Sequence, residues 1–175
     1  KRETVELSVK KVWNDKENQD GIRPTKVFAR LHTTSPNQMT LATVELDSKN
    51  NWSYTWTGLP KYYQNTEVQY AITEVFESAA VQEEYTSVVS KEENVFVITN
   101  SHVPKTTEVS VSKIWNDGEN QDGLRPASVK VNLLADGKPT GQMVLLNVDN
   151  QWSYTWKNLP AKKQGETIVY TVRSE

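Results

Sequence analysis

The sequence predicts an all-β protein built as two tandem antiparallel β-sandwiches. The chain contains nearly the same segment twice, since residues 11–24 read KVWNDKENQDGIRP and residues 113–126 read KIWNDGENQDGLRP. A second shared segment, WSYTW, begins at Trp52 and again at Trp152. The period of roughly 100 residues matches one ordinary domain and is too long for a solenoid unit. In addition, almost every segment alternates with period two, which is typical of strands.

The strands of the first copy follow from this alternation and from the turn signals between them, such as Asp20-Gly21 and Gly58-Leu59-Pro60. Short strands at this spacing favour an antiparallel sandwich. We expect strands over residues 4–13, 25–33, 40–47, 51–57, 67–77, 84–90 and 94–100.

The second copy is shorter than the first. A polar linker with a proline, residues 101–107, separates the two copies. We expect a complete domain over residues 1–103 and a second domain over residues 104–175. Because nothing in the second copy corresponds to residues 85–100, we expect it to be truncated before its last strand or strands, in a chain that is part of a longer protein. Its expected strands are residues 108–116, 127–135, 141–147, 151–157 and 166–174.

Composition excludes several classes of partner. The formal net charge is −2, so no basic surface points to nucleic acid or to a membrane surface. No stretch is apolar over the length needed to span a bilayer. Cysteine is absent, so in an extracellular protein any covalent staple has to come from chemistry other than a disulfide.

Three polar residues interrupt apolar stripes of the expected strands. Lys11 lies on the apolar face of the first strand, because side chains alternate along a strand. By the same alternation, Glu74 lies on the apolar face of the strand over residues 67–77, and Asn100 on that of the last strand. The pattern therefore predicts an amine, an acid and a carboxamide inside the first sandwich.

These residue types can react with one another in a core. Burial lowers the pKa of a lysine and raises that of a carboxylic acid, which favours a nucleophilic amine and a proton-donating acid. If Lys11 meets Asn100, the amine can attack the side-chain amide carbon while Glu74 moves protons and ammonia leaves. The product is an intramolecular isopeptide bond, and the fold supplies proximity and a dry site.

A buried ion pair explains the same periodicity without any bond. In that interpretation Lys11 pairs with Glu74, and Asn100 only caps a strand end. A lysine near a strand end can also extend its amine to solvent. The residues by themselves leave both interpretations open.

Several motifs occur in a fixed order along the chain: VKKVWND from Val9, NQDG from Asn18 with Arg23-Pro24 behind it, WSYTW from Trp52, YAITE from Tyr70 and VITN from Val97. In these motifs the sequence resembles the CnaB-type domains of Gram-positive surface proteins, the B-region repeats of collagen adhesins and related pilin modules. The resemblance covers essentially the whole chain. It implies a reverse-immunoglobulin-like sandwich with a self-made bond between Lys11 and Asn100, promoted by Glu74.

The second copy departs from the family pattern. Lys113 matches Lys11, but Ser174 stands where Glu74 does in the first copy, and Glu175 falls one residue late. The strand that ends in asparagine is absent. Lys113 therefore lacks a partner, and we expect no bond in this copy.

The resemblance implies a structural spacer of a cell-wall-attached adhesin or pilus-like protein outside the cell. Its partners would be neighbouring repeats of the same polypeptide, with host matrix contacted through other domains, and the chain would be a monomer. Beyond its single self-reaction it would be no enzyme, with no cofactor or metal. One alternative is an adhesin module that binds host matrix or glycan directly, and another is a carbohydrate-binding appendage of a secreted enzyme.

Two further features of the sequence have patterns that binding sites also show. Trp52, Tyr54 and Trp56 share a face, and we expect them to pack in the core, because the Ser/Thr face of that strand is the natural solvent side. The acidic loop over residues 15–20 does not fit a calcium loop, because Asp20 stands where the tight-turn glycine belongs.

Overall fold

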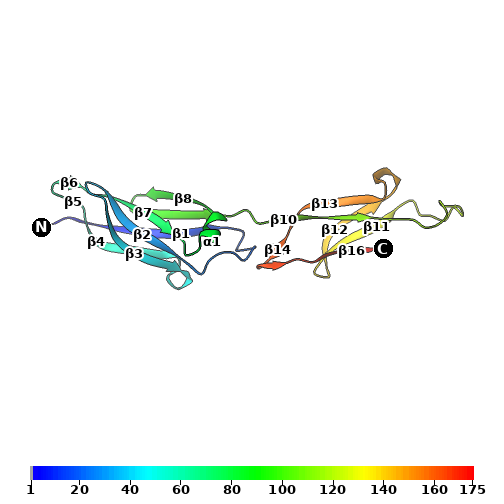
Figure 1. Ribbon diagram of the computed structural model, residues 1–175, viewed down its shortest axis with the longest axis horizontal. Coiled ribbons are helices and arrows are strands. Elements are labelled where there is room, and N and C mark those ends of the chain that lie inside the picture. Colours follow the sequence, from blue (N-terminus) through cyan, green and yellow to red (C-terminus); the bar gives the residue numbers. More distant parts are fainter. Residues whose placement is uncertain (1) are drawn as a thin grey trace. The chain divides into compact units, whose positions relative to one another are not determined.

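The computed structural model describes residues 2–175, and strands make up most of it (Figure 1). The chain divides into two compact units. Unit one holds the residues up to Asn18 together with Ile22–Val103, and unit two holds Gln19–Gly21 together with Pro104–Glu175. The predicted all-β class is confirmed in both units.

Unit one contains a four-stranded sheet with the strand order β4-β1-β9-β8. These strands are β4 (Ser53–Pro60), β1 (Thr4–Asn14), β9 (Val95–Ser101) and β8 (Thr86–Glu92). β1 is antiparallel to β4 but parallel to β9, which is an exception to the expected antiparallel pattern. The first and last strands of the unit are therefore direct neighbours that run in the same direction.

A three-stranded antiparallel sheet of order β3-β2-β7 forms the other layer of unit one. Its strands are β3 (Met39–Asp47), β2 (Lys26–Ser35) and β7 (Gln69–Val75). The smaller elements are a 3-10 turn η1 (Ser48–Asn50), a hairpin of β5 (Tyr62–Tyr63) with β6 (Thr66–Glu67), and the helix α1 (Ala79–Glu83).

The core of unit one lies between these two sheets. One set of fully or almost fully buried side chains comes from β1 and β9, and the other from β2, β3 and β7, as expected for a sandwich whose inner faces meet. Burying each of the valine, leucine and isoleucine side chains in this core contributes about 1.5–3 kcal/mol. The set includes Leu7, Val9, Ile98, Val27, Ala29, Leu31, Leu46 and Ile72.

The strands expected for unit one are all present, with ends that shift by a few residues. The helix α1 and the β5–β6 hairpin were missed, because both are too short to produce a periodic signal. α1 depends on a local cap, since the Ser78 hydroxyl accepts a hydrogen bond from the Val81 N–H.

Unit two repeats this plan with fewer strands. Its sheets have the orders β10-β13 and β12-β11-β16, and its core includes Val131, Leu133, Leu146, Trp156 and Leu159. The elements are β10 (Thr106–Ser112), β11 (Val129–Ala135), β12 (Lys138–Leu146), η2 (Val148–Asn150), β13 (Ser153–Pro160), β14 (Lys162–Lys163), β15 (Glu166–Thr167) and β16 (Tyr170–Ser174).

The first strand of unit two ends earlier than expected. The prediction of a strand over residues 108–116 is wrong beyond Ser112. In unit one, β1 continues to Asn14 because β9 pairs with it from Ser8 onward. Within residues 2–175 no strand takes that place beside β10, so the ladder that would extend it is missing.

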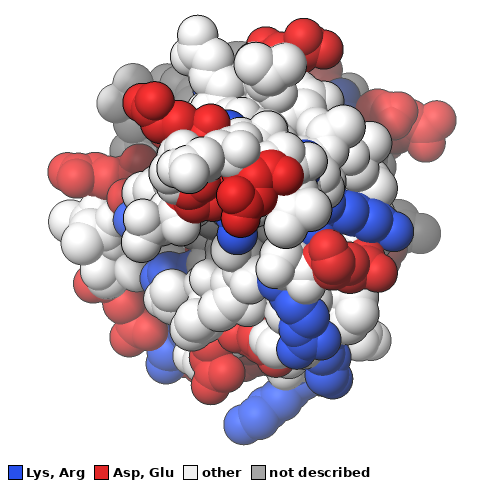
Figure 2. Space-filling view, turned by 90° about the vertical axis from the view of Figure 1, so that its right-hand side faces the viewer, with Lys and Arg blue, Asp and Glu red and all other residues white. Residues whose placement is uncertain are grey.

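Charges of both signs are interspersed on the face shown in Figure 2. In unit one, Lys26 and Glu45 form a partly exposed ion pair, with 2.7 Å between Nζ and Oε1. Among residues 2–175 no helix is long and apolar enough to cross a membrane.

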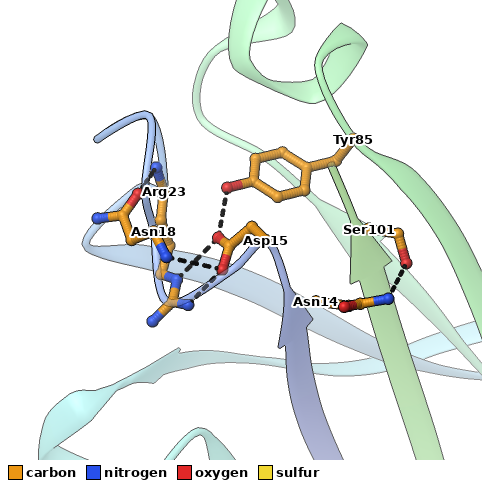
Figure 3. Close-up of polar contacts among 6 residues, drawn as sticks. All are labelled: Asn14, Asp15, Asn18, Arg23, Tyr85 and Ser101. Atoms are coloured by element: carbon orange, nitrogen blue, oxygen red, sulfur yellow. Dashed lines mark hydrogen bonds and ion pairs between the residues drawn. The ribbon is translucent and has the colours of Figure 1, made fainter. Parts of the chain in front are cut away.

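A buried aspartate fixes the loop after β1 (Figure 3). Arg23 donates to both oxygens of Asp15, at 3.1 Å from Nε to Oδ2 and 2.6 Å from Nη2 to Oδ1. The Tyr85 hydroxyl and the Asn18 N–H donate to the same carboxylate, at 2.8 and 3.0 Å. Burial by itself would raise the pKa of Asp15, but these hydrogen bonds outweigh it and hold the pKa below its ordinary value.

The same loop turns through left-handed backbone. Lys16, Glu17 and Asn18 have φ values of 53°, 56° and 61°. The equivalent of Lys16 in unit two is Gly118, with φ 63°, at one of the few positions where the two repeats differ in this segment. A glycine adopts this conformation at no steric cost, whereas a residue with a Cβ is strained.

We therefore predict that Lys16→Gly stabilises unit one by about 0.5–1 kcal/mol, because it removes the Cβ from a left-handed position. The measurement is the free energy of unfolding in guanidinium. Lys16→Ala is the control: it also removes the charged side chain but keeps the Cβ, so it should bring no such gain. Equal effects of the two substitutions would contradict the strain argument.

Candidate functional site

Lys11, Glu74 and Asn100 come together from three strands and both sheets of unit one. Lys11 is on β1, Asn100 is on the neighbouring β9, and Glu74 is on β7 in the facing sheet. In the parallel register Lys11 is opposite Ile98, and Asn100 is two residues further along β9. An offset of two residues keeps both side chains on the inner face of the sheet.

One carboxylate oxygen touches both partners. Glu74 Oε2 lies 2.6 Å from Lys11 Nζ and accepts a hydrogen bond of 2.8 Å from Asn100 Nδ2. The side chain of Lys11 is fully buried, that of Glu74 is 5% exposed, and Asn100 is fully buried. The structure thus places these residues in one contact cluster, called the buried triad below.

The surroundings of the amine are aromatic. Lys11 Nζ lies 4.3 Å from the centre of the Trp13 ring and 6.0 Å from that of Phe76. Burial lowers the pKa of Lys11 to about 8, although the hydrogen bond and charge of Glu74 and the charge of Asp15 act in the opposite direction. Loss of a proton is therefore easier for this amine than for an exposed lysine.

The buried triad has the parts that amide exchange between two side chains requires. A deprotonated amine is a nucleophile, and desolvation is one way in which proteins activate lysine. A carboxylate in contact with both nitrogens can take a proton from one and give it to the other. A plain ion pair needs only Lys11 and Glu74, and here Asn100 also contacts the shared carboxylate oxygen.

Ser87 is a member of this site that the sequence analysis missed. Its hydroxyl lies 2.6 Å from Asn100 Oδ1 and 3.0 Å from Glu74 Oε1. Ser87 is directly opposite Asn100 in the antiparallel pairing of β8 with β9, so their side chains share a face. A serine in an exposed strand has no distinguishing pattern, and only the register of β8 could have identified it.

The Cna protein B-type domain model matches residues 7–101 and 109–175. The chain belongs to the Cna B-type domain family. It is 40% identical over 170 residues to a collagen adhesin of Staphylococcus aureus, and this alignment covers 97% of the chain but 13% of that relative. The chain therefore spans a small part of the relative's length.

Two solved structures of S. aureus proteins are similar to this chain, to different degrees. A pair of B repeat units of the collagen-binding protein is similar with a TM-score of 0.88 at 34% identity, over 98% of this chain and 44% of that one. A single B repeat unit of the collagen-binding surface protein is 38% identical over 98% of this chain and 86% of that one, with a TM-score of 0.47. The chain is accordingly a tandem CnaB-type module of the surface-adhesin kind and not an enzyme.

The second CnaB-type unit lacks the acid at the matching position. Ser174 pairs with Val131 as Glu74 pairs with Ala29 in unit one, so Ser174 takes the place of Glu74 in the sheet. The serine does not supply the carboxylate that contacts both nitrogens in unit one.

Glu175 does not replace that missing acid. It accepts a hydrogen bond of 2.6 Å from Asn132 Nδ2 and lies 3.3 Å from Lys130 Nζ. Lys113 is exposed, with its Nζ 4.8 Å from the centre of the Trp115 ring. No ion pair of Lys113 is found within the described part of the chain, residues 2–175.

The aromatic strip of β4 is only partly in the core. Trp56 is buried, and Trp52 packs against the core and the edge of Trp13. Tyr54 is 42% exposed and leans on Trp56 with a centroid distance of 5.2 Å, so the expectation of core packing is wrong for this residue. β4 is an edge strand, which leaves one side of Tyr54 open to solvent.

We predict that an unlinked variant becomes more stable as pH rises through the alkaline range. Asn100→Ala keeps Lys11 and Glu74 but offers no amide carbon. Between pH 8 and 10.5 the unfolded chain retains a lysine proton that the folded chain has lost, so stability rises with pH there and is lowest below pH 8. The expected gain is about 1–3 kcal/mol.

The measurement is the free energy of unfolding by urea at pH 7 to 10.5. Lys11→Met with Asn100→Ala is the reference, because it has the same other titrating groups without the buried amine. If the two variants change in parallel with pH, the lowered pKa of Lys11 is refuted.

Proposed function

We propose that the chain is a load-bearing spacer of a surface adhesin, with one domain over residues 1–103 and a second over residues 104–175. In the first domain an isopeptide bond joins Lys11 Nζ to Asn100 Cγ, and Glu74 promotes its formation. The observation that supports this most directly is the contact of Glu74 Oε2 with both the amine and the carboxamide nitrogen.

The reaction proceeds once, within one chain. The Lys11 ammonium gives a proton to Glu74, and the free amine attacks Cγ of Asn100 to form the new carbon–nitrogen bond. Glu74 returns its proton to Nδ2 while it takes a second one from Nζ. The bond from Cγ to Nδ2 breaks, and ammonia leaves with the remaining acid proton as ammonium, which restores the carboxylate.

The fold accounts for the ease of this step. Groups held in contact react as if at a very high effective concentration, worth up to about 7–11 kcal/mol of barrier in well-oriented cases. The walls of Trp13 and Phe76 and the near-complete burial of the triad keep water out. In such a site the electrostatic contacts act more strongly than they would in water.

The bond has a mechanical consequence because it ties the first strand of the domain to the last. A force that enters through β1 and leaves through β9 passes across the bond, so residues 12–99 carry no tension. By the chain-entropy model used for disulfides, closing a loop of this length also stabilises the domain by about 4–5 kcal/mol. A surface protein without cysteine gains a covalent staple in this way.

The setting that fits this role is the cell surface. The family and the similarity to a collagen adhesin support an extracellular, wall-attached parent protein in which this monomeric chain adjoins further repeats. Host matrix would be bound through other domains of that parent. Nucleic acid and membrane have no part in the proposed role.

The mass of the intact protein tests the bond. We predict that wild type is lighter than its sequence by one ammonia, because one amide nitrogen leaves, and that Glu74→Ala and Lys11→Met have their full masses. Lys113→Met is the matched control in unit two and should still lose one ammonia. A wild type at full mass refutes the bond, and a loss of two ammonias refutes its restriction to unit one.

Pulling single molecules by their ends tests the load path. Wild type should show no unfolding extension from residues 12–99, because the bond bypasses them. Asn100→Ala should add that extension in a separate event. Equal extensions of wild type and Asn100→Ala would count against the spacer role.

A further inference from the structure

We propose that Ser87 is a further catalytic residue of the cross-linking reaction and donates its hydroxyl proton in a hydrogen bond to the carbonyl oxygen of Asn100 as the amine attacks. This inference rests on the proposed function, since it concerns the same bond. It adds a fourth residue, from a fourth strand, to the buried triad.

The contacts of Ser87 are directed at the reacting group. Its Oγ lies 2.6 Å from Asn100 Oδ1, at the short end of the range for hydroxyl hydrogen bonds. The oxygen that it contacts is bonded to the carbon that Lys11 attacks. When the carbon–nitrogen bond forms, negative charge develops on this oxygen, and a donor already in place stabilises that charge.

The two oxygens of Glu74 have different neighbours. Oε2 faces the two nitrogens that exchange protons, whereas Oε1 lies 3.0 Å from Ser87 Oγ. A hydroxyl has one proton and two lone pairs, so it can donate to Asn100 while it accepts from a protonated Glu74. The hydroxyl proton is therefore available to Asn100 Oδ1 while a lone pair of Oγ remains for Glu74.

The step balances in atoms and charge. On attack, Ser87 donates its hydroxyl proton in a hydrogen bond to the oxyanion that forms at Oδ1, and the proton stays bonded to Oγ. The acid proton of Glu74 moves between Nζ and Nδ2 through Oε2, as described above. When the bond from Cγ to Nδ2 breaks and the carbonyl re-forms, the hydroxyl proton is still on Ser87. The net products are still one isopeptide bond and one ammonia, and Ser87 is unchanged.

The register of the sheet makes this placement specific. β9 lies between β1 and β8, so Asn100 has the strand of Lys11 on one side and Ser87 directly opposite on the other. Within residues 2–175 unit two has no counterpart of β8 or β9, and Ser174 stands in place of the acid. The parts of the reaction centre are thus present together in unit one.

The expected effect of removing the Ser87 hydroxyl on the rate follows from comparable donors in enzymes. There, loss of one hydrogen-bond donor to the oxyanion slows the reaction by about 10²–10³-fold. β8 is an exposed edge strand, so water can partly replace the hydroxyl. We therefore expect Ser87→Ala to slow bond formation by about 10–100-fold without abolishing it.

The test measures the rate of bond formation in the full chain. Each variant is made by cell-free synthesis, translation is stopped, and the loss of ammonia is followed by intact mass over time. Ser87→Thr and Ser87→Val form the matched pair, because they are nearly isosteric and differ in the hydroxyl. Ser90→Ala, on the same strand, controls for the loss of a serine from β8.

The expected result is a rate close to wild type for Ser87→Thr and Ser90→Ala, and a rate lower by about 10–100-fold for Ser87→Ala and Ser87→Val. Tryptophan fluorescence checks that each variant has folded before the reaction is timed. If Ser87→Val keeps the rate of Ser87→Thr, the role of Ser87 is overturned while the bond itself stands. If wild type loses no ammonia, the proposed function fails instead.

Discussion

The structure of unit one depends on a lysine amine held inside an apolar sandwich. A buried charge is costly unless it is paired, and removing one partner of a buried pair is more costly than never having had the pair. Lys11 is accommodated by the carboxylate of Glu74 and by the ring of Trp13. Asn100 Nδ2 donates a hydrogen bond to the same carboxylate oxygen of Glu74 that contacts Lys11. Conversion of the amine into an amide would remove the positive charge of Lys11 from the core.

The proposed load path depends on the parallel pairing of β1 with β9. This pairing brings the first and last strands of the unit side by side, so the proposed bond between them would enclose nearly the whole domain. β8 on the far side of β9 adds Ser87, and β7 in the facing sheet adds Glu74. The proposed reaction centre therefore requires the complete sandwich, because each of its residues comes from a different strand.

The two repeats act as an internal comparison. Both retain the clamp of an arginine on an aspartate, with 2.6 Å between Arg23 Nη2 and Asp15 Oδ1 and the same distance between Arg125 and Asp117. In unit one the aspartate side chain is 1% exposed, and in unit two it is 31% exposed, because Tyr85 has no counterpart there. The loop is thus maintained by local sequence, whereas its burial depends on the strands packed around it.

The sequence by itself determined the repeat, the all-β class, most strands and the inward direction of Lys11, Glu74 and Asn100, because alternation with period two is local and survives in any sheet. Only the tertiary structure decided which strands are neighbours. The parallel pairing of β1 with β9, the early end of β10, the exposure of Tyr54 and the place of Ser87 beside Asn100 all follow from strand order and register. Those depend on contacts between residues far apart in the chain, which a periodic pattern does not encode.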